Sequence, residues 1–239
     1  MSHSVRRHLR LDIDAYDETI RRFIPGYEAM LEAAASAVGD VRLELALDLG
    51  AGTGGLSEVL LSKASIGVVE LLDVDAEMLA QARRRLADHG DRARFTLRSY
   101  DDAFPECGAI TASLSLHHVQ DMDAKRALYA RAFEALRPGG VLVNADAAVP
   151  ADGADRERAY RYWADHMVAS GIAEDHAWQH FEDWAAEDTY FPLETELAAL
   201  AAAGFEAACV WRDGPMAVTV GRKDLGVAGV VLEVESEMI

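Results

Sequence analysis

Cysteine is scarce in this sequence, whose 239 residues include only Cys107 and Cys209. The two cysteines have no metal-ligand spacing and make no disulfide framework, which excludes a small disulfide-rich scaffold and a zinc site built on cysteines. So few cysteines fit a reducing compartment, and we expect a cytoplasmic protein. No signal peptide and no apolar run of membrane-spanning length is visible, so we expect no membrane partner.

Basic side chains are also few compared with acidic ones. The sequence has 23 lysines and arginines against 41 aspartates and glutamates, which gives a formal net charge of −18. Such a chain repels a phosphate backbone unless a basic face is segregated from the rest, so we expect no nucleic-acid partner. The 51% apolar content is that of an ordinary globular protein, and the length suffices for one large domain with a modest insertion.

Glycine is concentrated where a predicted strand turns into a predicted helix. The apolar run 43–49 predicts a buried strand, and the glycine-rich residues 50–55 follow it directly. Leu56, Val59 and Leu60 then recur at helical spacing. The loop therefore opens onto a helix N-terminus, whose unpaired N–H groups favour an anionic or polar ligand.

From this loop onward, strand and helix patterns alternate, which predicts a mostly parallel sheet covered by helices on both faces. The long segment 151–192 breaks the rhythm with helical periodicity and many aromatic residues, so it reads as an inserted cap. The predicted strands are 43–49, 66–72, 94–97, 109–116, 141–144, 206–211 and 216–221, and the helices after the loop include 76–89, 124–136 and 194–203. A turn at 213–215 joins the last two strands as a hairpin, which makes the sheet mixed.

Three motifs, in order and at family spacing, resemble class I S-adenosylmethionine-dependent methyltransferases. Residues 48–54 look like the family's cofactor loop, 72–78 like its second motif, and 136–140 like the turn before its fifth strand. The resemblance implies S-adenosyl-L-methionine as the cofactor. It also implies an α/β fold: a Rossmann-like mixed seven-stranded sheet with helices on both faces, N-terminal lid helices and an inserted helical cap.

The expected organisation has five parts. They are a tail and lid helices at 1–40, an S-adenosylmethionine-binding core at 41–150, the substrate cap at 151–192, the remainder of the core at 193–221, and an acidic tail at 222–239.

The same resemblance implies where the cofactor lies. Gly50, Gly52 and Gly54 let the methionine part approach the backbone, and Asp48 orders the loop and faces the ammonium group. Asp73 follows the second strand and accepts hydrogen bonds from both ribose hydroxyls. The full expected set is Tyr16, Arg21, Tyr27, Asp48, Gly50, Ala51, Gly52, Gly54, Asp73, Val74, Met78, Ser99, Tyr100, Asp101 and Ser115.

The adenine end departs from the family pattern. Family members commonly have Gly-Asp near the end of the third strand, where the aspartate accepts from the adenine amino group, and here the matching pair is 98–99, Arg-Ser. Ser99, Asp101 or Asp102 could take that role. Met78 could cover the adenine face or be plain core.

The segment 16–27 resembles the lid of carboxy-S-adenosylmethionine synthases and related small-molecule methyltransferases. This implies that Tyr16, Arg21 and Tyr27 close over the cofactor's carboxylate. The alternative is a packing helix with exposed arginines. In the synthases an arginine before the sixth strand holds the extra carboxylate of the modified cofactor, and Ala199 aligns there, which favours ordinary methyl transfer.

Two histidines, His117 and His118, follow the fourth predicted strand at the edge where open α/β sheets place ligands. Either could be a general base. The cofactor's sulfonium is already activated, so a base is needed only if the acceptor must lose a proton. The family often shows a histidine pair here for structural or cofactor-lining reasons, and that reading stays open.

The cap should decide the substrate. Its aromatic side chains could wall a pocket for an aromatic or otherwise flat acceptor, or could anchor the cap on the sheet. The substrate candidates are Tyr160, Trp163, Trp178 and Trp184. His176 and His180 are four residues apart without an evident third ligand, so we expect no metal.

The sequence therefore predicts methyl transfer from S-adenosylmethionine to oxygen, nitrogen or carbon of a small molecule by in-line displacement. One alternative is modification of the cofactor itself, as in the carboxy-S-adenosylmethionine synthases. A second is a non-catalytic cofactor-binding protein, and a nicotinamide oxidoreductase comes last. We leave a homodimer open.

Overall fold

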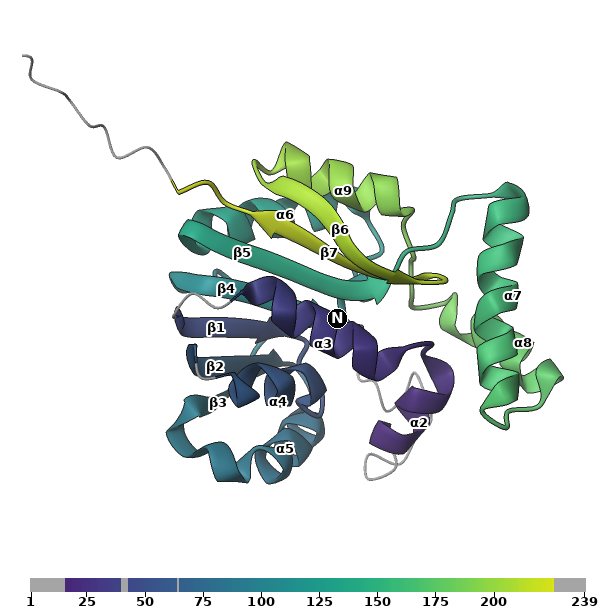
Figure 1. Cartoon of the computed structure of the whole chain (residues 1–239), viewed down its shortest axis with the longest axis horizontal. Helices are drawn as coiled ribbons and strands as arrows, with labels where there is room; N and C mark the ends of the chain where they lie inside the picture. Colours follow the sequence, from purple (N-terminus) through teal and green to yellow (C-terminus); the bar gives the residue numbers. More distant parts are fainter. Residues whose placement is uncertain (1–15, 40–42, 64, 226–239) are drawn as a thin grey trace, which may run out of the picture.

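The computed structural model describes residues 16–39, 43–63 and 65–225, and one seven-stranded sheet forms its centre (Figure 1). The strand order is β3-β2-β1-β4-β5-β7-β6. The first five strands are parallel, and β7 pairs antiparallel with both β5 and β6. The strands are β1 (Leu43–Leu49), β2 (Ile66–Asp73), β3 (Ala93–Leu97), β4 (Cys107–Ser113), β5 (Leu136–Ala147), β6 (Glu206–Asp213) and β7 (Met216–Arg222).

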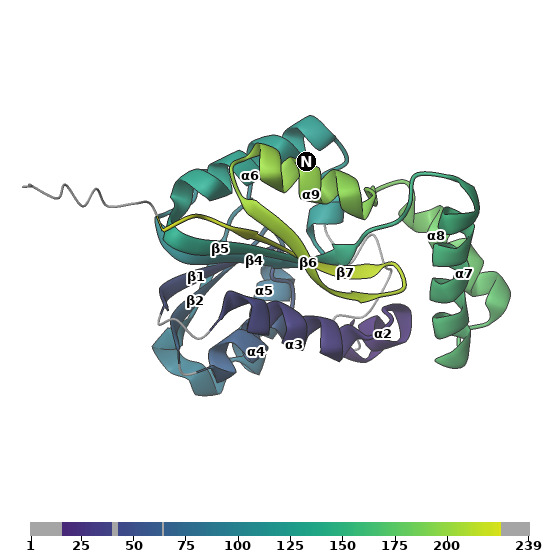
Figure 2. The ribbon, with the colours of Figure 1, turned by 45° about the horizontal axis from the view of Figure 1, so that its top comes forward.

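Helices cover both faces of the sheet, as the edge-on view shows (Figure 2). One face carries α3 (Tyr27–Val38), α4 (Gly55–Ser62) and α5 (Ala76–Arg85), and the other carries α6 (Met122–Ala135) and α9 (Leu193–Ala202). Each face has its own apolar core. Because central parallel strands are buried on both sides, β4 and the second half of β1 are continuous in buried residues rather than alternating.

Three helices stand beyond the carboxyl end of the sheet. They are α2 (Tyr16–Phe23), α7 (Gly153–Ala169) and α8 (Glu174–Trp184), with α7 and α8 beside α2 (Figures 1 and 2). The Nε1 group of Trp163 on α7 donates a hydrogen bond to the carbonyl of Phe23 on α2 at 2.6 Å. The cap and the lid therefore pack on each other rather than hanging separately from the sheet.

The predicted mixed seven-stranded fold is confirmed, with three local differences. The segment 136–140, expected as a turn, belongs to the long strand β5, and the register with β4 shifts there. The helix predicted at 76–89 ends at Arg85 and continues as a 3₁₀ helix, η2 (Ala87–Arg92), in which Gly90 has a φ of 55°. The predicted strand end at 114–116 is wrong, because Leu114 takes a left-handed φ of 49° and a short 3₁₀ helix, η3 (Leu116–His118), follows.

The predicted terminal tails lie largely outside the described residues, which begin at 16 and end at 225. Within the described ranges, no helix is both long and apolar enough to cross a membrane.

Candidate functional site

A cavity of about 360 Å³ opens at the carboxyl ends of the first four strands. Its walls include the glycine loop after β1, the pair 73–74 at the end of β2 and residues 98–101 after β3. From the end of β4 onward, residues 113–115, 118–121 and 124 line it as well. The strand order reverses at β1, whose neighbours β2 and β4 lead to opposite sides of the sheet. Open α/β sheets bind ligands at such a switch point.

The glycine loop brings bare backbone to this cavity. Gly50 has a φ of 61°, and a Cβ atom there would lie 2.6 Å from the Cβ of Ser115, so no larger residue fits without a shift. Gly52 has a φ of 55° and its N–H donates to the Oδ2 of Asp73 at 2.7 Å. The loop is thus fastened to the end of β2.

Asp73 is well placed for a ligand with paired hydroxyls. Its Oδ1 accepts from the backbone N–H of Asp75 at 2.8 Å, and its Oδ2 accepts from Gly52. Each carboxylate oxygen can accept a second hydrogen bond, so both remain able to bind hydroxyls. The side chain is buried, and burial raises the pKa of Asp73 above its ordinary value.

Asp48 contributes a second buried carboxylate to the cavity wall. It accepts hydrogen bonds from the hydroxyl of Ser57 at 2.6 Å and from the hydroxyl of Thr111 at 3.1 Å. Burial raises the pKa of Asp48 to about 6. A cationic group on the ligand would stabilise the ionised form of this carboxylate.

The end of the cavity that lies after β2 and β3 combines an apolar surface with polar side chains. Val74 is 39% exposed, which is unusual for valine, and it lines the cavity. The hydroxyl of Ser99 donates to Asp101 Oδ2 at 3.0 Å, and the N–H of Asp101 donates back to that hydroxyl at 3.1 Å. Tyr100 also lines the cavity, and burial raises the pKa of its phenol. An apolar surface beside these acceptors suits a flat, amino-bearing ring.

The lid helix α2 is held to the glycine loop by Asp17. Its carboxylate accepts from the hydroxyl of Thr53 at 2.8 Å and pairs with the guanidinium of Arg85. Arg21 does not lie at the cavity: its guanidinium pairs with Glu28 on the outer side of the lid. This position agrees with the alternative of a packing helix with exposed arginines, and closure of Arg21 over the cofactor's carboxylate stays a prediction. Tyr16 begins α2, and its side chain is outside what the structure describes.

Most of the predicted cofactor residues come together at the cavity. Those lining it are Tyr27, Asp48, Gly50, Ala51, Gly52, Asp73, Val74, Ser99, Tyr100, Asp101 and Ser115. Met78 is not among the lining residues because it is only 1% exposed and fills the buried face of α5. Gly54 is also outside the lining, and a Cβ atom there would meet Ala82 and Leu86.

The sequence prediction missed several lining residues. Thr53, Gly55, Leu56, Arg98, Ser113, Leu114, Val119, Gln120, Asp121 and Ala124 also form the walls. Thr53 and Gly55 could have been found, because they adjoin the recognised glycines. The segment 119–124 contains no recognised motif. It lines the cavity only because the chain turns back over the cavity after η3.

The two predicted histidines differ in position. His118 lines the cavity, whereas His117 is buried behind it. The Nδ1 atom of His117 lies 2.6 Å from Asp146 Oδ1 on β5, and its backbone N–H donates to Asp146 Oδ2 at 3.0 Å. Burial lowers the pKa of His117, but the carboxylates of Asp146 and Asp188 raise it by more, so the net shift is upward.

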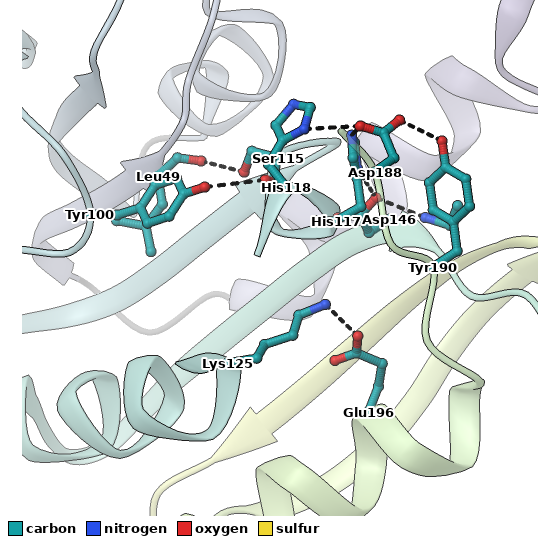
Figure 3. A network of polar contacts seen from close by, with 11 residues as sticks. Leu49, Tyr100, Ser115, His117, His118, Lys125, Asp146, Asp188, Tyr190 and Glu196 are labelled. Atoms are coloured by element: carbon teal, nitrogen blue, oxygen red, sulfur yellow. Dashed lines mark hydrogen bonds and ion pairs between the residues drawn. The ribbon is translucent and has the colours of Figure 1, made fainter. Parts of the chain in front are cut away.

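Asp188 from the cap completes this group (Figure 3). Its Oδ1 lies 3.0 Å from Nδ1 of His118, and its Oδ2 accepts from the hydroxyl of Tyr190 at 2.7 Å. The N–H of Thr189 donates to the carbonyl of His117 at 2.9 Å. This short segment therefore ties the cap to the histidine loop. Nothing in the sequence marks Asp188, one acid in an acidic cap.

The predicted substrate aromatics do not line the cavity. Trp163 and Trp184 are 1% and 4% exposed and lie 5.7 Å apart between ring centroids, in the interior shared by cap and lid. Tyr160 and Trp178 are half-buried against the ring of Phe181. Their contacts in this structure are those of the alternative, that they anchor the cap, and a role in walling the acceptor site stays a prediction.

Known proteins share both this sequence pattern and this fold. Residues 46–140 match the methyltransferase domain family. The matched domain includes the glycine loop, Asp73 and the histidine pair. The chain is 29% identical over 136 residues to an uncharacterized methyltransferase of Geobacillus kaustophilus, with 57% of this chain and 60% of that relative covered. The chain thus spans less than two thirds of this relative's length.

Two solved structures show the same fold around the matched domain. An O-methyltransferase family protein from Burkholderia thailandensis superposes with a TM-score of 0.64 at 15% identity, covering 90% of this chain and 60% of that one. Human N-acetylserotonin methyltransferase, solved in complex with SAM, gives 0.59 at 18% identity, covering 82% and 51%. At these identities the likeness establishes the Rossmann-like methyltransferase fold.

Proposed function

We propose that this chain is an S-adenosylmethionine-dependent methyltransferase that acts on a small molecule. The observation that carries the proposal is the cavity itself. The bare backbone at Gly50 and Gly52, the buried carboxylates of Asp48 and Asp73, and the exposed Val74 all face one space of about 360 Å³. These groups are the complements of a cofactor with an amino-acid end, a ribose and a purine.

Each wall has a proposed role. The glycine loop holds the methionine part and Asp48 faces its ammonium group, while Asp73 accepts from the ribose hydroxyls. Val74 covers the purine, and Ser99 or Asp101 accepts from its amino group. S-adenosylmethionine supplies, when bound, a methyl group already activated on a sulfonium. The protein's task is then to align the acceptor with that group and to exclude water.

The acceptor loses its proton, in this proposal, at the end of the cavity formed by η3. His118 lines the wall there, and Asp188 lies 3.0 Å from its Nδ1. A carboxylate in that position fixes the orientation of the imidazole, which suits proton transfer from an oxygen or nitrogen acceptor. His117, held by Asp146 behind the wall, orients the loop. The acid-rich composition favours a neutral or cationic acceptor.

A binding titration tests the proposal. Isothermal calorimetry should show one site for S-adenosylmethionine and for its demethylated product, and Asp73→Ala should weaken both by about 100-fold, since two charged hydrogen bonds are lost. Asp88→Ala removes an exposed carboxylate on η2 and serves as the matched control. The proposal fails if neither ligand binds, or if Asp73→Ala and Asp88→Ala bind equally well.

A non-catalytic cofactor-binding protein is the second candidate, because none of the four predicted cap aromatics reaches the cavity. Release of the demethylated product in a screen of small acceptors would exclude it. Modification of the cofactor itself is disfavoured on different grounds: Ala199 lies on the buried face of α9 and does not line the cavity. Incubation with prephenate and mass analysis of the cofactor would detect that reaction. The subgroup likeness of the lid remains a prediction, as do the cytoplasmic location and the homodimer.

A further inference from the structure

One set of metal-type ligand atoms comes together among the described residues, where η3 meets the cap. His117, His118 and Asp188 each offer one atom, and these atoms lie within 4.8 Å of one another. Asp188 Oδ1 is 3.0 Å from His118 Nδ1 and 3.7 Å from His117 Nε2. Two imidazoles and a carboxylate are a donor set that suits zinc and other first-row divalent cations.

The partners behind these atoms are those that metal sites use. The Nδ1 atom of His117 is held at 2.6 Å by Asp146, which leaves Nε2 directed to the shared space. Asp188 Oδ2 accepts from the Tyr190 hydroxyl, while its Oδ1 faces the two imidazoles (Figure 3). Histidine ligands are typically fixed in this way through their second ring nitrogen, and carboxylate ligands through their second oxygen.

The charges in this region also favour a cation. Asp146 and Asp188 are 5% and 8% exposed, so two carboxylates are buried beside the imidazoles. The buried cation nearby, Lys125, is paired with Glu196, which also accepts from the Tyr129 hydroxyl at 2.6 Å. The cluster therefore brings two buried carboxylates to two imidazoles, and a bound cation would offset the negative charge of those carboxylates.

We propose that His117 Nε2, His118 Nδ1 and Asp188 Oδ1 bind one divalent cation of the zinc class at the acceptor end of the cavity. The assignment of that end rests on the proposed function. A cation there lowers the pKa of a coordinated hydroxyl or thiol of the acceptor. In the metal-bound protein His118 is then a ligand, and the acceptor's proton leaves to solvent at the metal instead of passing to the imidazole.

Metal binding can be measured without any acceptor. Full-length protein is stripped with a chelator and titrated with Zn²⁺ by calorimetry, and with Co²⁺ by visible absorption. We expect one ion per chain and a d–d spectrum of four or five ligands with nitrogen donors. His118→Ala and Asp188→Asn should each weaken Zn²⁺ binding at least 100-fold. Tyr190→Phe, which removes only a supporting hydrogen bond, should weaken it by about 10-fold.

Two variants separate this proposal from the cofactor proposal. His176→Ala removes an exposed histidine on α8 and should leave both Zn²⁺ and S-adenosylmethionine binding unchanged. Asp73→Ala should lose cofactor binding and keep the metal. The metal site is overturned if no Zn²⁺ binds at 100-fold excess over protein. It is equally overturned if His118→Ala and Asp188→Asn, shown to be folded by circular dichroism, bind Zn²⁺ as the unchanged chain does.

Discussion

Asp48 shows at the scale of one residue how burial can couple ligand binding to pH. Its carboxylate accepts from Ser57 and Thr111, and burial raises its pKa to about 6. Above that pH the group is ionised and attracts an ammonium group, and below it the carboxylate is protonated. The attraction is therefore present at pH 7 and mostly lost at pH 5.

We accordingly predict that affinity for S-adenosylmethionine falls by up to about tenfold between pH 7 and pH 5, because about one tenth of a carboxylate with this pKa stays ionised at pH 5. Calorimetry at the two pH values measures the change. In Asp48→Asn, binding at pH 7 should be weaker and the change with pH smaller. An equal pH dependence in both proteins would contradict the assigned role.

Gly50 gives a second prediction at this scale. Gly50→Ala places a methyl group 2.6 Å from the Cβ of Ser115 and also strains a backbone with a φ of 61°. Gly90→Ala is the matched control, since Gly90 has a φ of 55° but nothing within 4 Å of the added atom. Urea unfolding should show a loss of stability for Gly90→Ala from its backbone alone, since a φ of 55° with a ψ of −134° favours glycine, and a larger loss for Gly50→Ala.

Only Gly50→Ala should also weaken cofactor binding, by about tenfold or more, since the contact distorts the loop that lines the cavity. Equal stability losses in the two variants would show that Ser115 yields to the methyl group.

Some residues of the cavity could be predicted from the sequence and others could not. Asp73 and the loop glycines were predictable, because a ligand that contacts backbone demands glycine at fixed spacing after a strand. Asp188 was not, since its role arises from the path of the cap back to η3 rather than from any local pattern. Met78 stayed open between core and ligand in the sequence, because helical spacing alone does not say which of the two a methionine faces, and the structure places it in the core.

Among the elements, the lid α2 has the clearest mechanical link to the cavity. Asp17 connects it to Thr53 in the glycine loop and to Arg85 at the end of α5. We predict that Asp17→Asn raises the dissociation rate of S-adenosylmethionine by about tenfold, because a charge-assisted contact of roughly 1.5 kcal/mol is weakened. Stopped-flow displacement measures this rate.

Glu18→Gln provides the comparison for the lid, since Glu18 is the next residue on α2 and is exposed. The same dissociation rate in both variants would mean that the Asp17 link does not hold the lid over the bound cofactor.

Elements were predicted well where periodicity alone decides them and less well where the tertiary structure intervenes. The bounds of β1 agree with the sequence prediction because apolar spacing and the flanking breaks set them. Residues 136–140 contain proline and two glycines, yet they continue β5 because the irregular register with β4 accommodates them. The cap aromatics were assigned to a ligand because the sequence cannot show that cap and lid share one interior.

At the scale of the whole molecule, the sheet order explains why distant residues share one cavity. β1 lies between β2 and β4, so loops that follow four strands meet at one edge of the sheet. The order of the strands could be expected from the family resemblance. The packing of the cap against η3 could not. The closed cap separates an aromatic interior from the cavity and brings Asp188 to the histidines.

A crystal structure of the chain with S-adenosylhomocysteine would show directly whether this cavity holds the cofactor. We predict density in the cavity with the ribose hydroxyls within hydrogen-bond distance of Asp73, the ammonium group at Asp48 and the purine against Val74. Density for the ligand at another place, or an unliganded cavity at saturating ligand, would contradict the claim.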